Sequence, residues 1–269
     1  MPKVLYEKRD RIAYVTLNRP EAKNAIDPET HELLWATWED FRDDDALDVA
    51  ILTGTGDAFC AGADLKTFIP PLMGATPQWV RDNVRTGLGG LTRGLHRIYK
   101  PVIAAVNGWA LAGGIETALA CDIRIASERA MFGSFEARRG YHHGDGGIVR
   151  LVNTCGAGVA LEMLLTAEPI DAQRALQCNL VSRVVPHDEL IPATELVASQ
   201  ILRNSQRAVR SAKETILDVI GRPLDDQLRI EALNGYSSPD PEETLALLQR
   251  FYDKTDEGRA GTHATPLPR

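Results

Sequence analysis

Short apolar runs rich in β-branched residues alternate with helix-forming stretches through the first two thirds of the chain. This alternation limits the possible folds more than any other feature. The runs are RIAYVTL (11–17), DVAILT (48–53) and PVIAAV (101–106), followed by shorter ones at Ile123–Ala126 and Ala130–Phe132. After the first run, Asp27-Pro28 is typical of a helix start with Asp27 as cap. Strands that alternate with helices predict mostly parallel pairing and an α/β fold.

The last third has a different pattern. From Gly158 onward the sequence predicts helices, interrupted by one strand at VSRVV (181–185). A length of 269 residues suits one α/β domain with a helical appendage, so we expect a core over residues 1–200 and a helical region over 201–269. The final stretch, EGRAGTHATPLPR, predicts a disordered tail. The poorly patterned segment Phe68–Arg97, which contains PPLMGATP, predicts a mobile lid or pocket wall.

Composition narrows the functional classes. Hydrophobic residues make up 44% and charged residues 25%, which is typical of a globular protein with a real core. The net charge of −7 argues against a nucleic-acid or anionic-membrane partner. The start, MPKVLYEKRDRIAYV, does not predict a signal peptide, and no apolar run predicts a membrane span. The four cysteines form no CxxC pair and predict reduced, mostly buried thiols in a cytoplasmic protein.

A pair of glycines opens a predicted apolar helix in GWALAGGIETALACDI (108–123). Gly113 and Gly114 permit a sharp turn and leave their N–H groups unobstructed at a helix start, where negative charge is stabilised. Glu116 is the one charged residue in this otherwise apolar helix. A first-turn glutamate on an exposed helix needs no function, but a helix buried all round makes this carboxylate costly unless it is used or paired.

A second corner of small residues follows a strand in GDAFCAGADLK (56–66). Taken alone, such a corner is usually only a turn. Two corners of this kind, each after a strand, can each supply one N–H to an oxyanion, as acyl chemistry requires.

Many ionisable groups gather in FGSFEARRGYHHGDGGIVRL (132–151). Glu136 is predicted at the end of a strand, where α/β folds place reactive side chains. Arg138 and Arg139 indicate surface ion pairs or loop contacts, and Asp145 between glycines is typical of a turn residue that bonds its own backbone. Adjacent histidines point in different directions, and His142 and His143 have no accompanying metal-ligand spacing, so no metal is predicted. A Ser/His/Asp relay stays open, although no GxSxG elbow is present.

Together these motifs resemble the crotonase family, also called the enoyl-CoA hydratase/isomerase superfamily. The resemblance runs through RIAYVTLNRPEAKNAI, FCAGADLK, KPVIAAVNGWALAGGIETALACDIRIA, FGSFEARRG and LLTAEPIDAQRALQCNLVSRVVP. It implies a spiral of ββα turns and a C-terminal helical region that builds homotrimers, often paired into hexamers. It also implies a coenzyme A thioester whose carbonyl accepts hydrogen bonds from the N–H groups of Ala63 and Gly113. Coenzyme A would lie near Ala22, Lys23, Ala25, Ala61, Asp64 and Leu65.

Within this family the resemblance favours an enoyl-CoA hydratase, which adds water across a 2,3-double bond without a metal or redox cofactor. Hydratases have a glutamate three residues after the middle glycine and another four residues before the loop glycine, and Glu116 and Glu136 match these positions. The resemblance implies that Glu116 deprotonates the water, while Glu136 holds it and delivers a proton to Cα. Dienoyl isomerases and dehalogenases use an aspartate where this chain has Gly144, so Asp145 is one position late. Double-bond isomerisation and C–C bond hydrolysis remain alternatives.

The chain departs from the usual hydratase pattern after the loop glycine, where it has HHGDGG in place of IPGAGG. His142, His143 and Asp145, together with Phe68, are therefore candidate acyl-pocket residues, and substitutions on the surface are an equal alternative. Only Phe251 and Lys254 remain of the family's late aromatic-Lys-Arg ending, which leaves a late phosphate contact in doubt. A non-catalytic crotonase-fold binding module is the alternative from another class, and the retained glutamates weigh against it.

Overall fold

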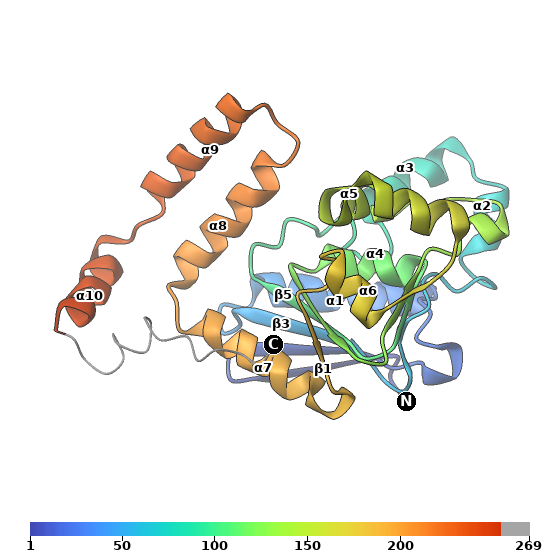
Figure 1. Cartoon of the computed structure of the whole chain (residues 1–269), viewed down its shortest axis with the longest axis horizontal. Helices are drawn as coiled ribbons and strands as arrows, with labels where there is room; N and C mark the ends of the chain where they lie inside the picture. Colours follow the sequence, from blue (N-terminus) through green and yellow to red (C-terminus); the bar gives the residue numbers. More distant parts are fainter. Residues whose placement is uncertain (254–269) are drawn as a thin grey trace. The chain divides into compact units, whose positions relative to one another are not determined.

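The computed structural model describes residues 1–253, which divide into two compact units (Figure 1). Met1–Arg203 contains every described strand and the helices around them, and the second unit begins at Asn204. The predicted disorder of the tail and the predicted contact of Lys254 lie outside the described residues.

The larger sheet has six strands in the order β1-β2-β3-β5-β7-β10. Their bounds are β1 Val4–Arg9, β2 Ile12–Leu17, β3 Val49–Gly54, β5 Val102–Val106, β7 Ile123–Ser127 and β10 Arg183–Val185. β1 pairs antiparallel with β2, and all the other neighbours in this sheet pair parallel. The α/β fold with mostly parallel pairing is therefore confirmed.

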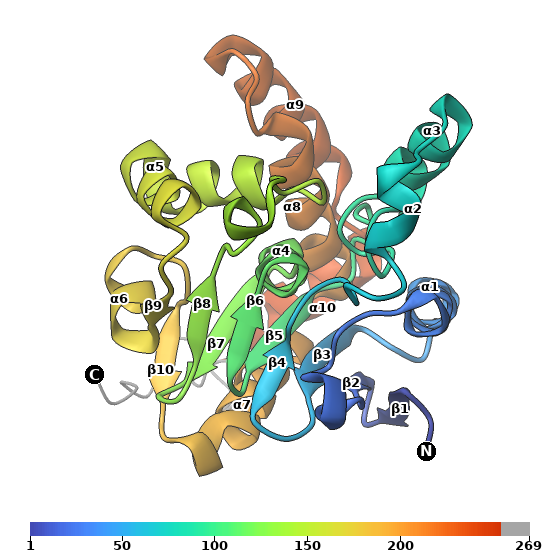
Figure 2. The ribbon, with the colours of Figure 1, turned by 90° about the vertical axis from the view of Figure 1, so that its right-hand side faces the viewer.

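The smaller sheet has four strands in the order β4-β6-β8-β9. They are β4 Ala58–Cys60, β6 Trp109–Leu111, β8 Met131–Gly133 and β9 Ile170–Asp171, and the first three run parallel. β3, β5 and β7 of the larger sheet are each followed in the chain by a strand of the smaller one, which makes successive turns of a ββα spiral. Figure 2 shows β4, β6 and β8 side by side with α4 (Gly113–Ala120) above β6.

Both faces of the larger sheet are covered, which explains why its strands are almost continuously apolar. On one face, α1 (Pro28–Asp43) packs Leu34, Trp38 and Phe41 into the main core. On the other face, α7 (Leu190–Leu202) buries apolar side chains against β2, β3, β5 and β7. Asp27 caps α1 as predicted, because its side chain accepts a hydrogen bond from the N–H of Thr30 at 2.8 Å.

The remaining elements of the first unit connect these layers. They are η1 Pro20–Ala22, α2 Ile69–Met73, α3 Pro77–Thr86, η2 Ala137–Arg139, α5 Gly147–Thr166, α6 Ala172–Gln177 and η3 His187–Glu189. Two predicted boundaries were wrong. Strand β8 ends at Gly133, so Glu136 lies beyond the strand at the start of η2, and the helix expected from Gly158 already begins at Gly147.

Helix α5 also corrects the prediction about membrane spans. By length and composition alone it is apolar enough to cross a membrane, the one such helix among residues 1–253. It is not one continuous helix, since Gly156 has φ 79° and ψ 161° in its middle. Several of its apolar side chains are exposed, including Val149 at 62% and Leu165 at 76%.

The second unit contains α8 (Gln206–Val219), α9 (Leu224–Ser237) and α10 (Pro241–Tyr252). Ser205 caps α8 and also donates a hydrogen bond to Glu243 of α10 at 2.8 Å. Asn234 of α9 donates to Thr215 of α8 at 3.0 Å. None of the residues that form these three helices is fully buried within one chain.

Candidate active site

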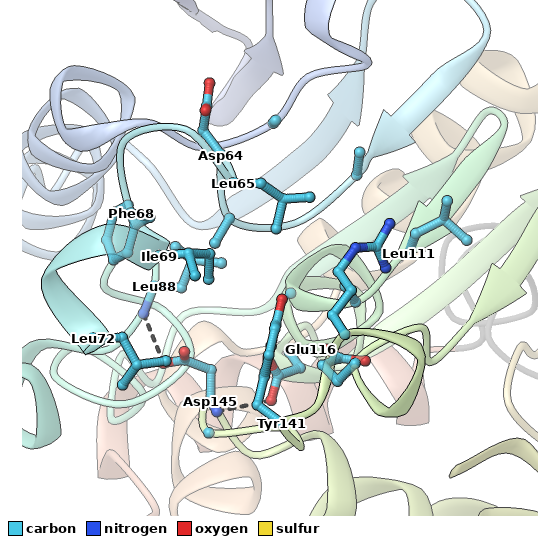
Figure 3. Close-up of a pocket in the computed structure, with 18 of the residues that line it drawn as sticks. Asp64, Leu65, Phe68, Ile69, Leu72, Leu88, Leu111, Glu116, Tyr141 and Asp145 are labelled. Carbon is cyan, nitrogen blue, oxygen red and sulfur yellow. Dashed lines mark hydrogen bonds between the residues drawn. The ribbon is translucent and has the colours of Figure 1, made fainter. Parts of the chain in front are cut away.

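A pocket of about 790 Å³ lies within the first unit (Figure 3). Figure 3 shows Leu65, Ile69 and Leu72 on one side of it and Glu116 and Tyr141 on the other. Thirteen of the fourteen predicted site residues line it: Ala22, Ala25, Ala61, Ala63, Asp64, Leu65, Phe68, Gly113, Glu116, Glu136, His142, His143 and Asp145. Lys23 does not line this pocket, and its ammonium group lies 2.5 Å from the carboxylate of Asp57.

The segment predicted as a lid or pocket wall does form one side of the pocket. It folds into α2 and α3, and Phe68, Ile69, Leu72, Trp79 and Leu88 line the pocket from this segment. Thr76 caps α3 by accepting a hydrogen bond from the N–H of Trp79 at 3.1 Å. This wall is mostly apolar and therefore suits the acyl part of a substrate better than a charged group.

The two small-residue corners meet at the start of α4. A Cβ on Gly113 would lie 3.3 Å from the backbone nitrogen of Ala63, and a Cβ on Gly114 would lie 1.9 Å from the carbonyl oxygen of Cys60. Only glycine permits this approach. Ala112 directs the chain into α4 with an unusual backbone at φ 53° and ψ −125°. The N–H groups of Ala63 and Gly113 thus belong to adjacent backbone, as a pair of oxyanion donors requires.

Glu116 lies at this helix start and is 3% exposed. Every residue of α4 from Gly113 to Leu119 is buried, as the sequence predicts. The Oε1 atom of Glu116 accepts hydrogen bonds from the N–H of Asp145 at 2.7 Å and of Gly147 at 2.9 Å. Two backbone donors stabilise the buried carboxylate as an anion.

Glu136 faces the same space from the start of η2 and is also 3% exposed. Between the two carboxylates lies the imidazole of His143. Its Nδ1 is 2.9 Å from Oε1 of Glu136 and 3.3 Å from Oε1 of Glu116, and its Nε2 is 2.6 Å from Oγ of Ser134. The Nδ1 contacts do not have linear hydrogen-bond geometry, so we regard them as ion pairs.

These contacts decide the charge of the histidine. Burial by itself lowers the pKa of His143, but the carboxylates of Glu116 and Glu136 outweigh burial and raise the pKa to about 9. Near neutral pH the ring is therefore an imidazolium. His142, by contrast, is exposed, so the adjacent histidines diverge as predicted.

The sequence spacing predicts no metal here, yet the fold brings together three side chains that could each act as a ligand. Glu116, Glu136 and His143 each offer a ligand atom, and these atoms lie within 4.8 Å of one another. The three residues come from separate elements, so local spacing could not have revealed the group.

Asp145 does not bond its own backbone as predicted. Its Oδ1 accepts hydrogen bonds from the N–H of Leu88 at 2.8 Å and from Oγ1 of Thr92 at 3.2 Å. Burial raises the pKa of this carboxyl, and the Arg93 guanidinium opposes the rise. Asp145 therefore connects the apolar wall to the loop that holds Glu116. Arg138 forms the predicted surface ion pair, at 2.7 Å from Glu168.

An α/β spiral whose pocket brings together two buried carboxylates and the adjacent backbone of Ala63 and Gly113 defines an enzyme site. The family model described as enoyl-CoA hydratase/isomerase matches residues 7–258. The chain belongs to this family.

Curated relatives are similar over most of the chain. It is 39% identical over 222 residues to (E)-benzylidenesuccinyl-CoA hydratase of Thauera aromatica, covering 82% of this chain and 84% of that protein. It is 37% identical over 234 residues to crotonyl-CoA hydratase of Syntrophomonas wolfei, covering 85% and 86%. The solved structure of enoyl-CoA hydratase from Bacillus anthracis has a TM-score of 0.84 at 33% identity, covering 96% of this chain and all of that one.

Proposed function

We propose that this protein is an enoyl-CoA hydratase that adds water across the 2,3-double bond of an acyl-CoA thioester. The observation that carries the proposal is the placement of Glu116 and Glu136 in one pocket with the adjacent backbone of Ala63 and Gly113. Relatives at 37–39% identity are named as hydratases of CoA thioesters, which supports the same chemistry.

In the proposed mechanism the thioester carbonyl accepts hydrogen bonds from the N–H groups of Ala63 and Gly113. These bonds strengthen as negative charge develops on the oxygen, so they stabilise the enolate more than the substrate. Glu116 is the base that takes a proton from water as the oxygen attacks Cβ. Glu136 belongs to the acid–base group that returns a proton to Cα.

The coenzyme A part of the substrate would pass along Ala22, Ala25, Ala61, Asp64 and Leu65, which line the pocket together. Lys23 is paired with Asp57 and would have to leave this ion pair to contact coenzyme A. We propose that it assists coenzyme A binding from outside the pocket. The acyl group would lie against Phe68 and the wall formed by α2 and α3. The reaction needs no metal or redox cofactor, because the carboxylates move the protons and the N–H pair stabilises the enolate.

We propose that the chain acts as a homotrimer or as a dimer of trimers. Exposed apolar side chains support a subunit interface on α5, where Leu161 is 53% and Leu165 76% exposed. In the second unit, Leu228 and Leu233 of α9 are 55% and 65% exposed. Four free cysteines, most of them buried, accord with a reducing compartment such as the cytoplasm.

The test is turnover of short, long, branched and aromatic enoyl-CoA thioesters, with product analysis in D2O and in water labelled with 18O. Uptake of one solvent oxygen with the carbon skeleton intact supports hydration. Solvent deuterium at carbon without oxygen uptake would instead indicate isomerisation, and a broken carbon skeleton would indicate C–C hydrolysis. Failure to bind any acyl-CoA in calorimetry would favour a non-catalytic binding module.

A further inference from the structure

We propose that His143 is a third acid–base residue of this site, an imidazolium that carries the proton delivered to Cα. This proposal rests on the proposed hydratase function and reassigns the last proton transfer within it. Glu136 then acts through His143, which it holds in place.

The contacts of the ring place Nδ1 between two carboxylates and Nε2 against a hydroxyl group. Nδ1 faces Oε1 of Glu136 at 2.9 Å and Oε1 of Glu116 at 3.3 Å, where an unprotonated nitrogen would place its lone pair against two anions. Oγ of Ser134 lies 3.2 Å from Oε2 of Glu136 and 2.6 Å from Nε2 of His143, so it can accept from Nε2 while its hydroxyl hydrogen points to Glu136. An imidazolium places a proton on Nδ1 between the two carboxylates and lets Nε2 donate to Oγ of Ser134.

The absence of a side chain at Gly147 leaves space for this ring. A Cβ on Gly147 would lie 2.7 Å from Nδ1 and Cγ of His143 and 3.0 Å from Cγ of Glu116. The His143 side chain is 1% exposed, yet the residue lines the pocket together with both glutamates. The ring is therefore fixed between the carboxylates at the wall of the pocket.

The same contacts resemble a serine–histidine–carboxylate relay, but Ser134 does not fit the role of a nucleophile. Ser134 is 2% exposed and is not one of the residues that line the pocket. Its hydroxyl oxygen lies between Nε2 of His143 and Oε2 of Glu136. Ser134 is a positioning residue that orients the ring.

The side chains of this site account for every proton in the reaction: Glu116 and His143 transfer protons, and Glu136 holds His143 in place. Water adds its oxygen to Cβ as Glu116 takes one of its protons, and the π electrons of the double bond move into the enolate. Cα then takes the proton from Nδ1 of His143, and the enolate returns to the thioester. Glu116 finally returns the proton it took from water to Nδ1 of His143, which restores the imidazolium and the Glu116 carboxylate. One water is added, and no other group changes charge.

Other titratable groups around the cluster also have shifted pKa values. Burial and the neighbouring carboxylates raise the pKa of Tyr141 above its usual 10.0, and burial lowers the pKa of the Arg150 guanidinium. Burial raises the pKa of Asp145, with Arg93 opposing. Loss of one proton near pH 9 is assigned to His143 by comparison with the His143→Gln variant.

The first experiment measures kcat and KM for hydration of the best enoyl-CoA between pH 6 and 10.5 in wild type, His143→Gln and Ser134→Ala. We expect wild-type kcat to fall as pH rises through about 9. His143→Gln should lower kcat about 100-fold or more, change KM little and lose the alkaline fall. Ser134→Ala should keep kcat within about tenfold, whereas loss of all activity in this variant would indicate a nucleophile.

The control is His187→Gln, which removes a serine–histidine contact of similar kind outside the pocket, Oγ of Ser127 to Nδ1 of His187 at 3.0 Å. It should leave kcat and its pH dependence unchanged. An active wild type whose His143→Gln variant keeps kcat and the alkaline fall overturns the role of His143 but not the hydratase function. A wild type that hydrates no thioester overturns both.

A second experiment measures the protonation of the His143 ring nitrogens directly. Nitrogen-15 NMR of histidine-labelled full-length protein, assigned with His143→Gln, should show both ring nitrogens of His143 protonated at pH 7.5. They should lose one proton near pH 9. A neutral ring at pH 7.5 overturns the proposal, as does binding of one Zn²⁺ per chain that depends on His143 and is tight enough to displace this proton.

Discussion

The backbone N–H of Gly147 donates to Oε1 of Glu116 at 2.9 Å, although 31 residues separate them. At the same time, the missing side chain of Gly147 leaves room for the ring of His143. Gly147, in the first turn of α5, thus positions the carboxylate of Glu116 through its N–H. Because it has no side chain, it also leaves room for the imidazole of His143. Both functions depend on the same glycine.

Replacing Gly147 with Ala should therefore disturb the site. The new methyl group would lie 2.7 Å from the His143 ring, so the ring or the helix start must move. We expect a loss of about 1–3 kcal/mol in the free energy of unfolding and at least a tenfold fall in kcat. The control is Gly158→Ala in the same helix, where nothing lies within 4 Å. It should stabilise the helix slightly and leave kcat unchanged, and equal effects of the two substitutions would contradict the argument.

Glu116→Gln and Glu136→Gln should each lower turnover by about two to four orders of magnitude, because each removes a charge from the acid–base group. The amide is similar in size, so circular dichroism should show an intact fold. Glu168→Gln, which removes only the surface partner of Arg138, serves as the control. Retention of most crotonyl-CoA hydration by both pocket variants would rule out the hydratase mechanism.

Gly113→Ala should separate binding of coenzyme A from stabilisation of the enolate. Its methyl group would lie 3.3 Å from the nitrogen of Ala63 and 2.4 Å from Cδ2 of Leu88, a side chain that can move. It would crowd the thioester oxygen and weaken both hydrogen bonds. We expect kcat to fall roughly 10- to 1000-fold, with the calorimetric Kd of free coenzyme A nearly unchanged. Equal losses in both quantities would instead place the effect on general binding.

Stability should depend on the charge of His143. Its folded-state pKa of about 9 exceeds the usual histidine pKa of 6.5, so its stabilising contribution is complete below pH 6.5 and is lost as pH rises through 9. The full difference is on the order of 3 kcal/mol. Urea unfolding at pH 6, 7.5 and 9.5 should show this loss in wild type. The free-energy difference between wild type and His143→Gln should shrink over the same range, and a constant difference would contradict the raised pKa.

Asp145→Ala should affect substrate binding more than chemistry. It removes the acceptor for the N–H of Leu88 and the hydroxyl of Thr92, while the backbone N–H to Glu116 remains. Loosening of the apolar wall should raise KM about tenfold, with kcat changed little. Asp145→Asn keeps an oxygen acceptor and should retain a KM close to that of wild type. An unchanged KM in Asp145→Ala would show that the wall does not depend on this contact.

Much of the fold could be predicted because the determinants are local. Apolar strand runs and the Asp27-Pro28 cap act over a few residues, and the structure has both where expected. The start of α5 could not be predicted in this way. Gly146 and Gly147 disfavour a helix locally, and the N–H of Gly147 is satisfied by Glu116 from another element.

The site residues likewise fall into those that a local motif predicts and those that only the tertiary structure brings together. The sequence located Glu116, Glu136 and the two glycine corners, because each has a recognisable motif. It left His143 between a pocket role and the surface, and it missed Ser134 altogether. Ser134 and His143 are nine residues apart and their side chains are in contact. A loop has no fixed periodicity from which such a contact could be inferred.

The pocket has two sides that come from different parts of the chain. α2 and α3 supply the apolar wall, while α4, η2 and the start of α5 hold the acid–base residues. The hydrogen bond from Leu88 to Asp145 joins the two sides. We accordingly expect that mutations that reshape the wall between residues 69 and 86 alter acyl preference while the reaction stays the same. Such a division lets relatives diverge in substrate by changing one short segment, and it marks that segment as the place to begin redesign.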